Sequence, residues 1–186
     1  IGILKASLLL DAKKINEAEL TCDELDKIKP DSVEVMEIRL AITELKNDTK
    51  TKNQQLKKIL AKDPYNVNAN VELAQSSAIK KNYNQAKSYY LKALRKEPYN
   101  EDALFGCGQM DYYLKNDESA KKIFNTLLEI NPRNASAYAY LGKIYYANDK
   151  YKLALDYIEK ALEIEPNNYD YNMDYGTYNR YSGKFE

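Results

Sequence analysis

The five prolines of this chain are evenly spaced, and their spacing restricts the fold more than any other feature of the sequence. Each proline follows the previous one after 34 residues, and the set is Pro30, Pro64, Pro98, Pro132 and Pro166. Proline ends a helix because it lacks an amide donor and clashes with the preceding turn. Unrelated helix ends would not recur at one interval, so the chain is predicted to consist of 34-residue repeats.

Inside a repeat, the apolar residues follow a helical period. The first half of residues 135–168 has one stripe at i, i+3, i+4 and i+7, made of Tyr138, Leu141, Gly142 and Tyr145. A second stripe follows the polar break at 148–150 and contains Tyr151, Ala154, Ile158, Ala161 and Leu162. Each repeat is therefore predicted to form two amphipathic helices of about 13 residues joined by a short polar turn. One such pair cannot bury its apolar face alone, so successive pairs must stack.

Small residues also recur at fixed places. With proline as position 32, position 8 is small in all copies except Leu40, the others being Ala6, Ala74, Gly108, Gly142 and Gly176. Position 20 is alanine in all copies except Lys52, the others being Ala18, Ala86, Ala120 and Ala154. Small side chains let two helix backbones approach closely, so these positions are predicted to be helix contacts.

The pattern resembles the tetratricopeptide repeat, which has an aromatic residue at position 4, Leu-Gly at 7 and 8, Tyr at 11, Ala at 20, an aromatic or large apolar residue at 24, Ala at 27 and Pro at 32. Residues 135–168 match it best, through Tyr138, Leu141, Gly142, Tyr145, Ala154, Ile158, Ala161 and Pro166. Residues 33–66 match it least, with Arg39 at position 7 and Lys52 at position 20. The resemblance implies an all-α fold, a right-handed superhelical solenoid of antiparallel helix pairs whose first helices line a concave groove.

The repeat register divides the whole chain, residues 1–186, into one array. Its parts are a partial first repeat (1–32), a degenerate second repeat (33–66), three further repeats (67–100, 101–134 and 135–168) and the first helix of a truncated sixth repeat (169–186). The chain starts at Ile1, inside a repeat, and stops at Glu186 where a second helix would begin. We expect it to be an excised piece of a longer protein.

Composition excludes several classes of function. Lys and Arg number 28 and so do Asp and Glu, so no excess of positive charge is available to neutralise a nucleic acid. The chain has no His, which removes the commonest general base and metal ligand. Cys22 and Cys107 fall at core positions, and Gly106-Cys107-Gly108 is interpreted as close helix packing. We therefore expect no enzyme, no cofactor and no metal site. We also expect no membrane span, since no apolar run approaches about 20 residues.

The first helix of each repeat has a second stripe, at positions 2, 5, 9, 12 and 13, opposite its core-facing side. In the family, that stripe lines the groove. The residues predicted to bind a partner are Val71, Gln75, Phe105, Gln109, Tyr112, Tyr113, Lys143, Tyr146, Arg180 and Tyr181. Tyrosine offers a large apolar body with a polar tip, which suits protein interfaces. The alternative is compositional bias, because all 18 tyrosines lie after residue 64.

Position 5 tests one known binding mode of the family. Members that capture the terminal carboxylate of a chaperone use a lysine there. In this chain, position 5 holds Ile3, Glu37, Val71, Phe105, Ala139 and Met173. Capture of a chaperone tail is therefore not expected.

These observations predict a non-catalytic protein–protein interaction module that binds a peptide or helix of a partner in an aromatic, near-neutral groove. One alternative is a scaffold that self-associates through uncapped ends into a homo-oligomer. Another is the recognition arm of a larger enzyme. No segment addresses the chain to a compartment, and a soluble, cytoplasmic protein is the default expectation.

Overall fold

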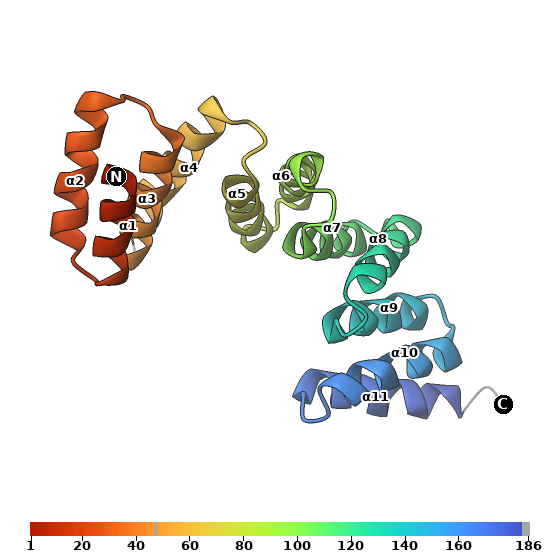
Figure 1. The fold of residues 1–186 in the computed structure, drawn as a ribbon. Helices are drawn as coiled ribbons and strands as arrows, with labels where there is room; N and C mark the ends of the chain where they lie inside the picture. Colours follow the sequence, from red (N-terminus) through yellow and green to blue (C-terminus); the bar gives the residue numbers. More distant parts are fainter. Residues whose placement is uncertain (47, 184–186) are drawn as a thin grey trace. The chain divides into compact units, whose positions relative to one another are not determined.

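The structure is a computed structural model that describes residues 1–46 and 48–183. Within these residues all regular secondary structure is α-helical (Figure 1). The helices are α1 (Gly2–Asp11), α2 (Ile15–Ile28), α3 (Val33–Leu45), α4 (Thr49–Lys62), α5 (Val67–Ile79), α6 (Tyr83–Lys96), α7 (Glu101–Tyr113), α8 (Asp117–Ile130), α9 (Ala135–Ala147), α10 (Tyr151–Ile164) and α11 (Tyr169–Ser182). The prediction of an all-α fold is confirmed. The division into six repeats at the boundaries given above stays a prediction.

The prolines end the even-numbered helices as the spacing predicts. Helices α2, α4, α6, α8 and α10 each stop two residues before a proline. Past four of these prolines, an asparagine side chain caps the next helix. Asn66, Asn100, Asn134 and Asn168 accept hydrogen bonds from the backbone amides of Ala69, Ala103, Ala137 and Tyr171, at the starts of α5, α7, α9 and α11. The Pro-x-Asn sequence therefore ends one helix and begins the next.

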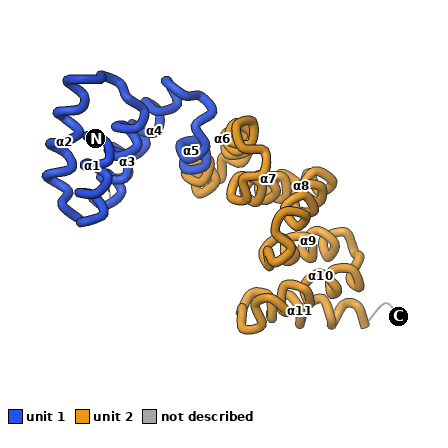
Figure 2. The backbone as a smooth tube through the Cα atoms, viewed as in Figure 1, with its two compact units in different colours: residues 1–73 blue, residues 74–186 orange. Residues whose placement is uncertain are grey.

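The helices fall into two compact units, residues 1–73 and residues 74–186 (Figure 2). The boundary lies inside α5. In unit 1, Ala6, Ala18, Cys22 and Val35 are part of one core formed by α1, α2 and α3. In unit 2, Leu104, Phe124 and Ile144 belong to a core shared by α7, α8 and α9, and a second core joins α9, α10 and α11. Cys22 and Cys107 are buried, as predicted.

The two charged departures in residues 33–66 are both paired with carboxylates. Arg39 replaces the leucine of the motif, and its guanidinium lies 2.7 Å from Asp23 and 2.7 Å from Asp26. Lys52 replaces an alanine, and its ammonium lies 2.9 Å from Glu44 and 2.6 Å from Glu72. Each cation bridges two acidic side chains, so the degenerate repeat substitutes ion pairs for the missing apolar contacts.

A third departure is Asp111, which stands where the motif has tyrosine and is fully buried in α7. Its carboxylate accepts hydrogen bonds from Lys87 of α6, from Ser119 of α8 at 2.6 Å and from Asn116 at 3.0 Å. Burial by itself would raise the pKa of Asp111, but these hydrogen bonds outweigh it and hold the pKa below its usual value. Asp111 therefore links α6, α7 and α8 through its charged form.

Three glycines mark close approaches between helices. A Cβ added at Gly106 would lie 2.2 Å from the ring of Tyr90, which is only 4% exposed. One added at Gly108 would lie 2.7 Å from the Phe124 ring, and one at Gly142 would lie 3.3 Å from the carbonyl oxygen of Ala154. At Gly176, an added Cβ would meet nothing within 4 Å. Only some small positions of the repeat are therefore tight.

The glycines give a matched pair of variants. Gly106→Ala should lower the free energy of unfolding by about 2 kcal/mol, because the buried Tyr90 ring must shift to accommodate the methyl group. Gly176→Ala should raise it by up to about 1 kcal/mol, because alanine favours the helix and the methyl group has space. Urea unfolding followed by circular dichroism measures both. Equal effects of the two substitutions would contradict the close approach of α6 and α7.

Acid should weaken the Asp111 network. Its folded-state pKa is lowered, so its stabilising contribution is complete above the unfolded-state pKa of about 4 and is lost as the pH falls through the folded-state value. Asp111→Asn should lower the unfolding free energy by about 2 kcal/mol at neutral pH, with the deficit shrinking below about pH 4. The control is Asp102→Asn, an exposed residue of α7. A deficit that does not change with pH would be evidence against a charged Asp111.

Candidate partner-binding surface

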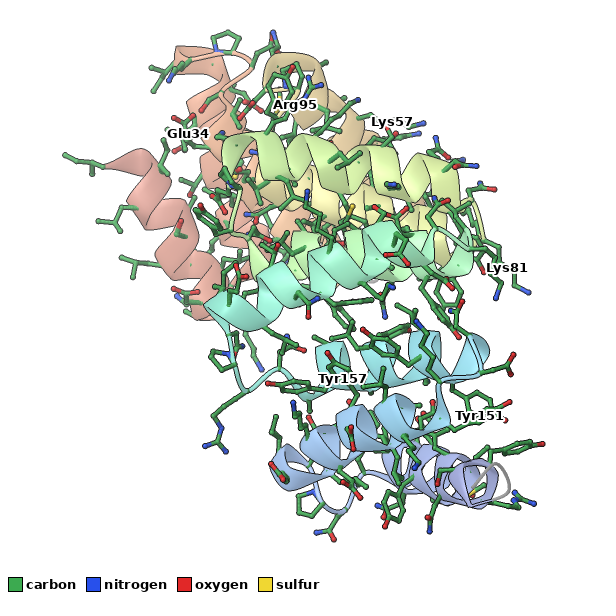
Figure 3. The ribbon with its side chains drawn as sticks, turned by 90° about the vertical axis from the view of Figure 1, so that its right-hand side faces the viewer. Glu34, Lys57, Lys81, Arg95, Tyr151 and Tyr157 are labelled. Atoms are coloured by element: carbon green, nitrogen blue, oxygen red, sulfur yellow. The ribbon has the colours of Figure 1, made fainter. Side chains whose placement is uncertain are left out.

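Aromatic side chains of unit 2 gather in three groups, two of which contain residues predicted to bind a partner and the third of which is Tyr138, Tyr145 and Tyr157. The first is here called the α7–α9 cluster, after the helices that carry most of its rings. It consists of Tyr83 of α6 together with Phe105, Tyr112, Tyr113, Phe124 and Tyr140. The second, called the α9–α11 cluster, consists of Tyr146, Tyr151, Tyr178 and Tyr181. Figure 3 shows Tyr151 on α10, together with Tyr157, which lies farther along the same helix and stacks on Tyr145 with ring centroids 5.2 Å apart.

Tyr140 of α9 lies at the centre of the α7–α9 cluster. Its ring centroid is 5.3 Å from that of Phe124, 5.4 Å from that of Tyr112 and 5.7 Å from that of Phe105. Its hydroxyl accepts a hydrogen bond of 2.9 Å from the Gln109 amide and lies 3.3 Å from the hydroxyl of Tyr113. Burial raises the pKa of Tyr140 far above its usual value. The Tyr140 ring therefore fixes the arrangement of α7 and α9, and its hydroxyl stays protonated.

Tyr146 occupies the corresponding place in the α9–α11 cluster. Its ring stacks on that of Tyr178 with centroids 4.7 Å apart, and the centroids of Tyr151 and Tyr181 are each 5.6 Å away. Tyr151 donates a hydrogen bond of 2.6 Å to the carboxylate of Asp149, and this bond raises the pKa of Tyr151 to about 12. The cluster joins three successive helices, each contributing at least one tyrosine.

The structure places the sequence-predicted residues unevenly. Phe105, Gln109, Tyr112 and Tyr113 come together around Tyr140, and the rings of Tyr146 and Tyr181 contact each other with centroids 5.6 Å apart. Arg180 is an exposed residue of α11. Val71 is half-buried in unit 1, whereas Gln75 is exposed in unit 2. Sequence reasoning missed Tyr140, although an aromatic residue at position 6, beside the predicted stripe, could have signalled it.

The clustered aromatic residues are only partly available to a partner. Tyr113 is 44% exposed, whereas Phe105 and Tyr112 are half-buried and pack against the core of α7, α8 and α9. Tyr146 is half-buried against the core of α9, α10 and α11. These rings therefore hold neighbouring helices together and present their remaining surface to solvent.

Lys143 of α9 lies beside the α7–α9 cluster and also reaches toward α11. Its ammonium is 5.5 Å from the centroid of the Tyr140 ring and 3.6 Å from the carboxylate of Asp174 on α11. The first contact is a cation–π interaction and the second is an ion pair that is longer than a hydrogen bond. This part of the surface thus combines aromatic rings with the charges of Lys143 and Asp174.

Unit 1 has a separate hollow of about 260 Å³ that the sequence-predicted residues do not include. It is lined by residues of α3, α4 and α5 and of the segment before α5: Glu37, Leu40, Ala41, Glu44, Ile59, Asn66, Asn68, Ala69 and Glu72. Two of its carboxylates, those of Glu44 and Glu72, bind Lys52, and the third, that of Glu37, accepts a hydrogen bond of 2.9 Å from the Asn66 amide. The three carboxylates that line this hollow are therefore already paired with side chains of unit 1.

The cysteines are not poised for nucleophilic chemistry. Burial raises the pKa of Cys107 to about 11, and the nearby Asp111 carboxylate acts in the same direction. Burial also raises the pKa of Cys22. In the part of the chain that the structure describes, no group of His, Cys, Asp and Glu residues has the arrangement of a metal site, and no helix is both long and apolar enough to cross a membrane.

Both thiols should therefore be inert in the folded protein. At pH 8, a disulfide reagent that releases a coloured thiolate should modify neither Cys22 nor Cys107, because both are buried and protonated. Denaturant should expose both cysteines to rapid reaction. Fast modification of a thiol in the native protein would contradict this environment.

Comparison with known proteins adds two matches to family models, both described as tetratricopeptide repeat, at residues 78–144 and 135–168. No curated protein matches the sequence. Among solved structures, YrrB, described as a TPR protein with an unusual peptide-binding site, is 19% identical with a TM-score of 0.74, over 89% of this chain and 86% of YrrB. PilF of Pseudomonas aeruginosa is 17% identical with a TM-score of 0.70, over 95% of this chain and 86% of PilF.

A third structure is the first TPR of Spaghetti (RPAP3), bound to the HSP90 peptide SRMEEVD. It is 23% identical with a TM-score of 0.59, over 61% of this chain and 90% of its own. At these identities the likeness concerns the fold.

Proposed function

Because the chain is a tetratricopeptide-repeat protein, we propose that it is a non-catalytic binding module that holds a peptide or helix of a partner protein. The proposed binding surface consists of the sequence-predicted residues that lie in unit 2, with Tyr140 added. The observation that carries this proposal is the gathering of six aromatic side chains in the α7–α9 cluster, with Tyr113 still 44% exposed. A partly exposed aromatic cluster of this kind suits a protein contact.

The contacts suggest how binding would work. Apolar side chains of the partner would bury the solvent-facing parts of Phe105, Tyr112 and Tyr113. These rings lose little conformational freedom, because the core holds Phe105 and Tyr112 and the rings of Tyr83 and Tyr112 hold Tyr113. Tyr hydroxyls at the surface would hydrogen-bond to the partner's backbone. Balanced charge favours such contacts over a nucleic acid.

The similar structures support a peptide as the ligand class. YrrB is described as having a peptide-binding site, and the first TPR of RPAP3 is bound to an HSP90 peptide. This chain has no lysine at position 5 of any repeat, so a different peptide from that of RPAP3 is expected. The partner is proposed to meet the surface through apolar and aromatic side chains.

Self-association is a second candidate function, favoured by the surface of α1. Leu4 is 65% exposed and Leu8 is 58% exposed, beside an apolar hollow of about 390 Å³. A second copy could cover this face. Sedimentation equilibrium over a range of concentrations distinguishes a monomer from such an assembly.

The binding proposal predicts a specific loss on truncating Tyr113. Dodecapeptides selected on the wild-type chain from a random phage-displayed library should bind Tyr113→Ala about 10-fold more weakly, as measured by fluorescence polarisation. Tyr113 is preferable to Tyr112 or Tyr146, whose rings pack into the cores, so that alanine there also weakens the fold.

The matched control is Tyr99→Ala. Tyr99 is 71% exposed in the segment between α6 and α7 and lies outside both aromatic clusters. The Tyr99→Ala variant should bind the selected peptides as tightly as the wild type. The proposal fails if the wild type enriches no peptide over an unrelated protein, or if the two alanine variants lose affinity equally.

A further inference from the structure

Two equivalent side-chain pairs link successive odd-numbered helices in unit 2. Gln109 of α7 faces Tyr140 of α9, and Lys143 of α9 faces Asp174 of α11, each pair being separated by 31 residues. The first pair is closed by a hydrogen bond of 2.9 Å. In the second pair, the ammonium remains 3.6 Å from the carboxylate oxygen, beyond hydrogen-bond distance. Position 9 of one repeat therefore forms a hydrogen bond with position 6 of the next in the first pair, and does not in the second pair.

Asp174 is the residue of the second pair that lacks a hydrogen bond to one of its carboxylate oxygens. Its side chain is 26% exposed, yet its Oδ2 atom is buried and has no hydrogen-bond partner. Burial raises the pKa of Asp174, and the neighbouring Lys143 offsets this only in part. Asp170, one turn earlier on α11, adds a second negative charge that acts in the same direction. The carboxylate therefore lacks full compensation of its charge.

Lys143 is held by two groups at once. Its ammonium lies over the Tyr140 ring, which draws it toward the α7–α9 cluster and away from Asp174. The Asp174 carboxylate also acts on a tyrosine in each aromatic cluster. Its charge contributes to raising the pKa of Tyr112 in one cluster and of Tyr178 in the other, although burial is the main cause in both. Asp174 thus lies beside the proposed binding surface.

We propose that Asp174 is a subsite for a cationic side chain, lysine or arginine, of the bound peptide. The cation would approach the exposed part of the carboxylate, while Lys143 stays on the side of the buried Oδ2 atom. A carboxylate that is half removed from water gains more from a second cation than a fully hydrated one does. This inference rests on the proposed function, and it gives the partner a chemistry: an apolar or aromatic segment that also carries a positive charge.

The test selects peptides from the same random dodecapeptide library on the wild type, Asp174→Asn and Asp170→Asn. Lysine and arginine should be enriched several-fold at one position of the wild-type peptides, and this enrichment should disappear with Asp174→Asn. Asparagine has the size of aspartate and removes a half-buried charge, so the variant is expected to fold. Asp170→Asn is the matched control, because it removes the same charge from the same helix and should retain the enrichment.

A second arm changes the peptide and leaves the protein intact. Replacing the selected lysine or arginine by norleucine should weaken binding to the wild type about 10-fold and leave binding to Asp174→Asn unchanged, which is the coupling that a double-mutant cycle measures.

The outcomes separate the subsite from the binding surface. Selected peptides that depend on Tyr113 but show no enrichment of cations, or the same enrichment with Asp174→Asn, overturn the subsite and leave the proposed function standing. Equal cation losses with Asp170→Asn and Asp174→Asn also overturn it, because they indicate general electrostatic attraction. If no peptide is enriched on the wild type, the proposed function and the subsite both fail.

Discussion

A pair of amphipathic helices cannot bury its own apolar faces, and the packing of each pair on the next is the interaction on which this structure depends. One core contains Leu104 of α7, Phe124 of α8 and Ile144 of α9, so the first helix of the next pair covers the previous one. The same arrangement joins α9, α10 and α11 through Ile158 and Tyr178. Where a buried side chain of the neighbouring helix leaves no room for a Cβ atom, glycine is required, as at Gly106 against the Tyr90 ring.

The packing of the pairs also explains how the repeat pattern tolerates charged residues. Arg39 and Lys52 stand where the motif has apolar residues, and each bridges two carboxylates on neighbouring segments. Asp111 is buried, and side chains of α6, α8 and the turn between α7 and α8 supply its hydrogen bonds. A charged residue is accepted at an inter-helix position only when neighbouring segments provide its partners.

The aromatic surface has two roles that follow from one arrangement. Tyr140 and Tyr146 join successive helices through ring contacts, and the same rings fix the side chains that remain exposed beside them, such as Tyr113. A binding surface whose rings are already ordered loses less conformational entropy when a partner binds. Asp174 and Lys143 add charge to this aromatic surface.

The sequence by itself determined the helices and their order, because proline, asparagine caps and the apolar period act locally within one or two turns. It also predicted that Phe105, Tyr112 and Tyr113 share one face of a helix. Only the tertiary structure decided that Tyr140 would lie at their centre, that Asp111 would be satisfied and that Asp174 would not be. These outcomes depend on distances between side chains about 30 residues apart, such as Lys143 and Asp174, and the packing of the helices sets those distances whereas local propensity does not.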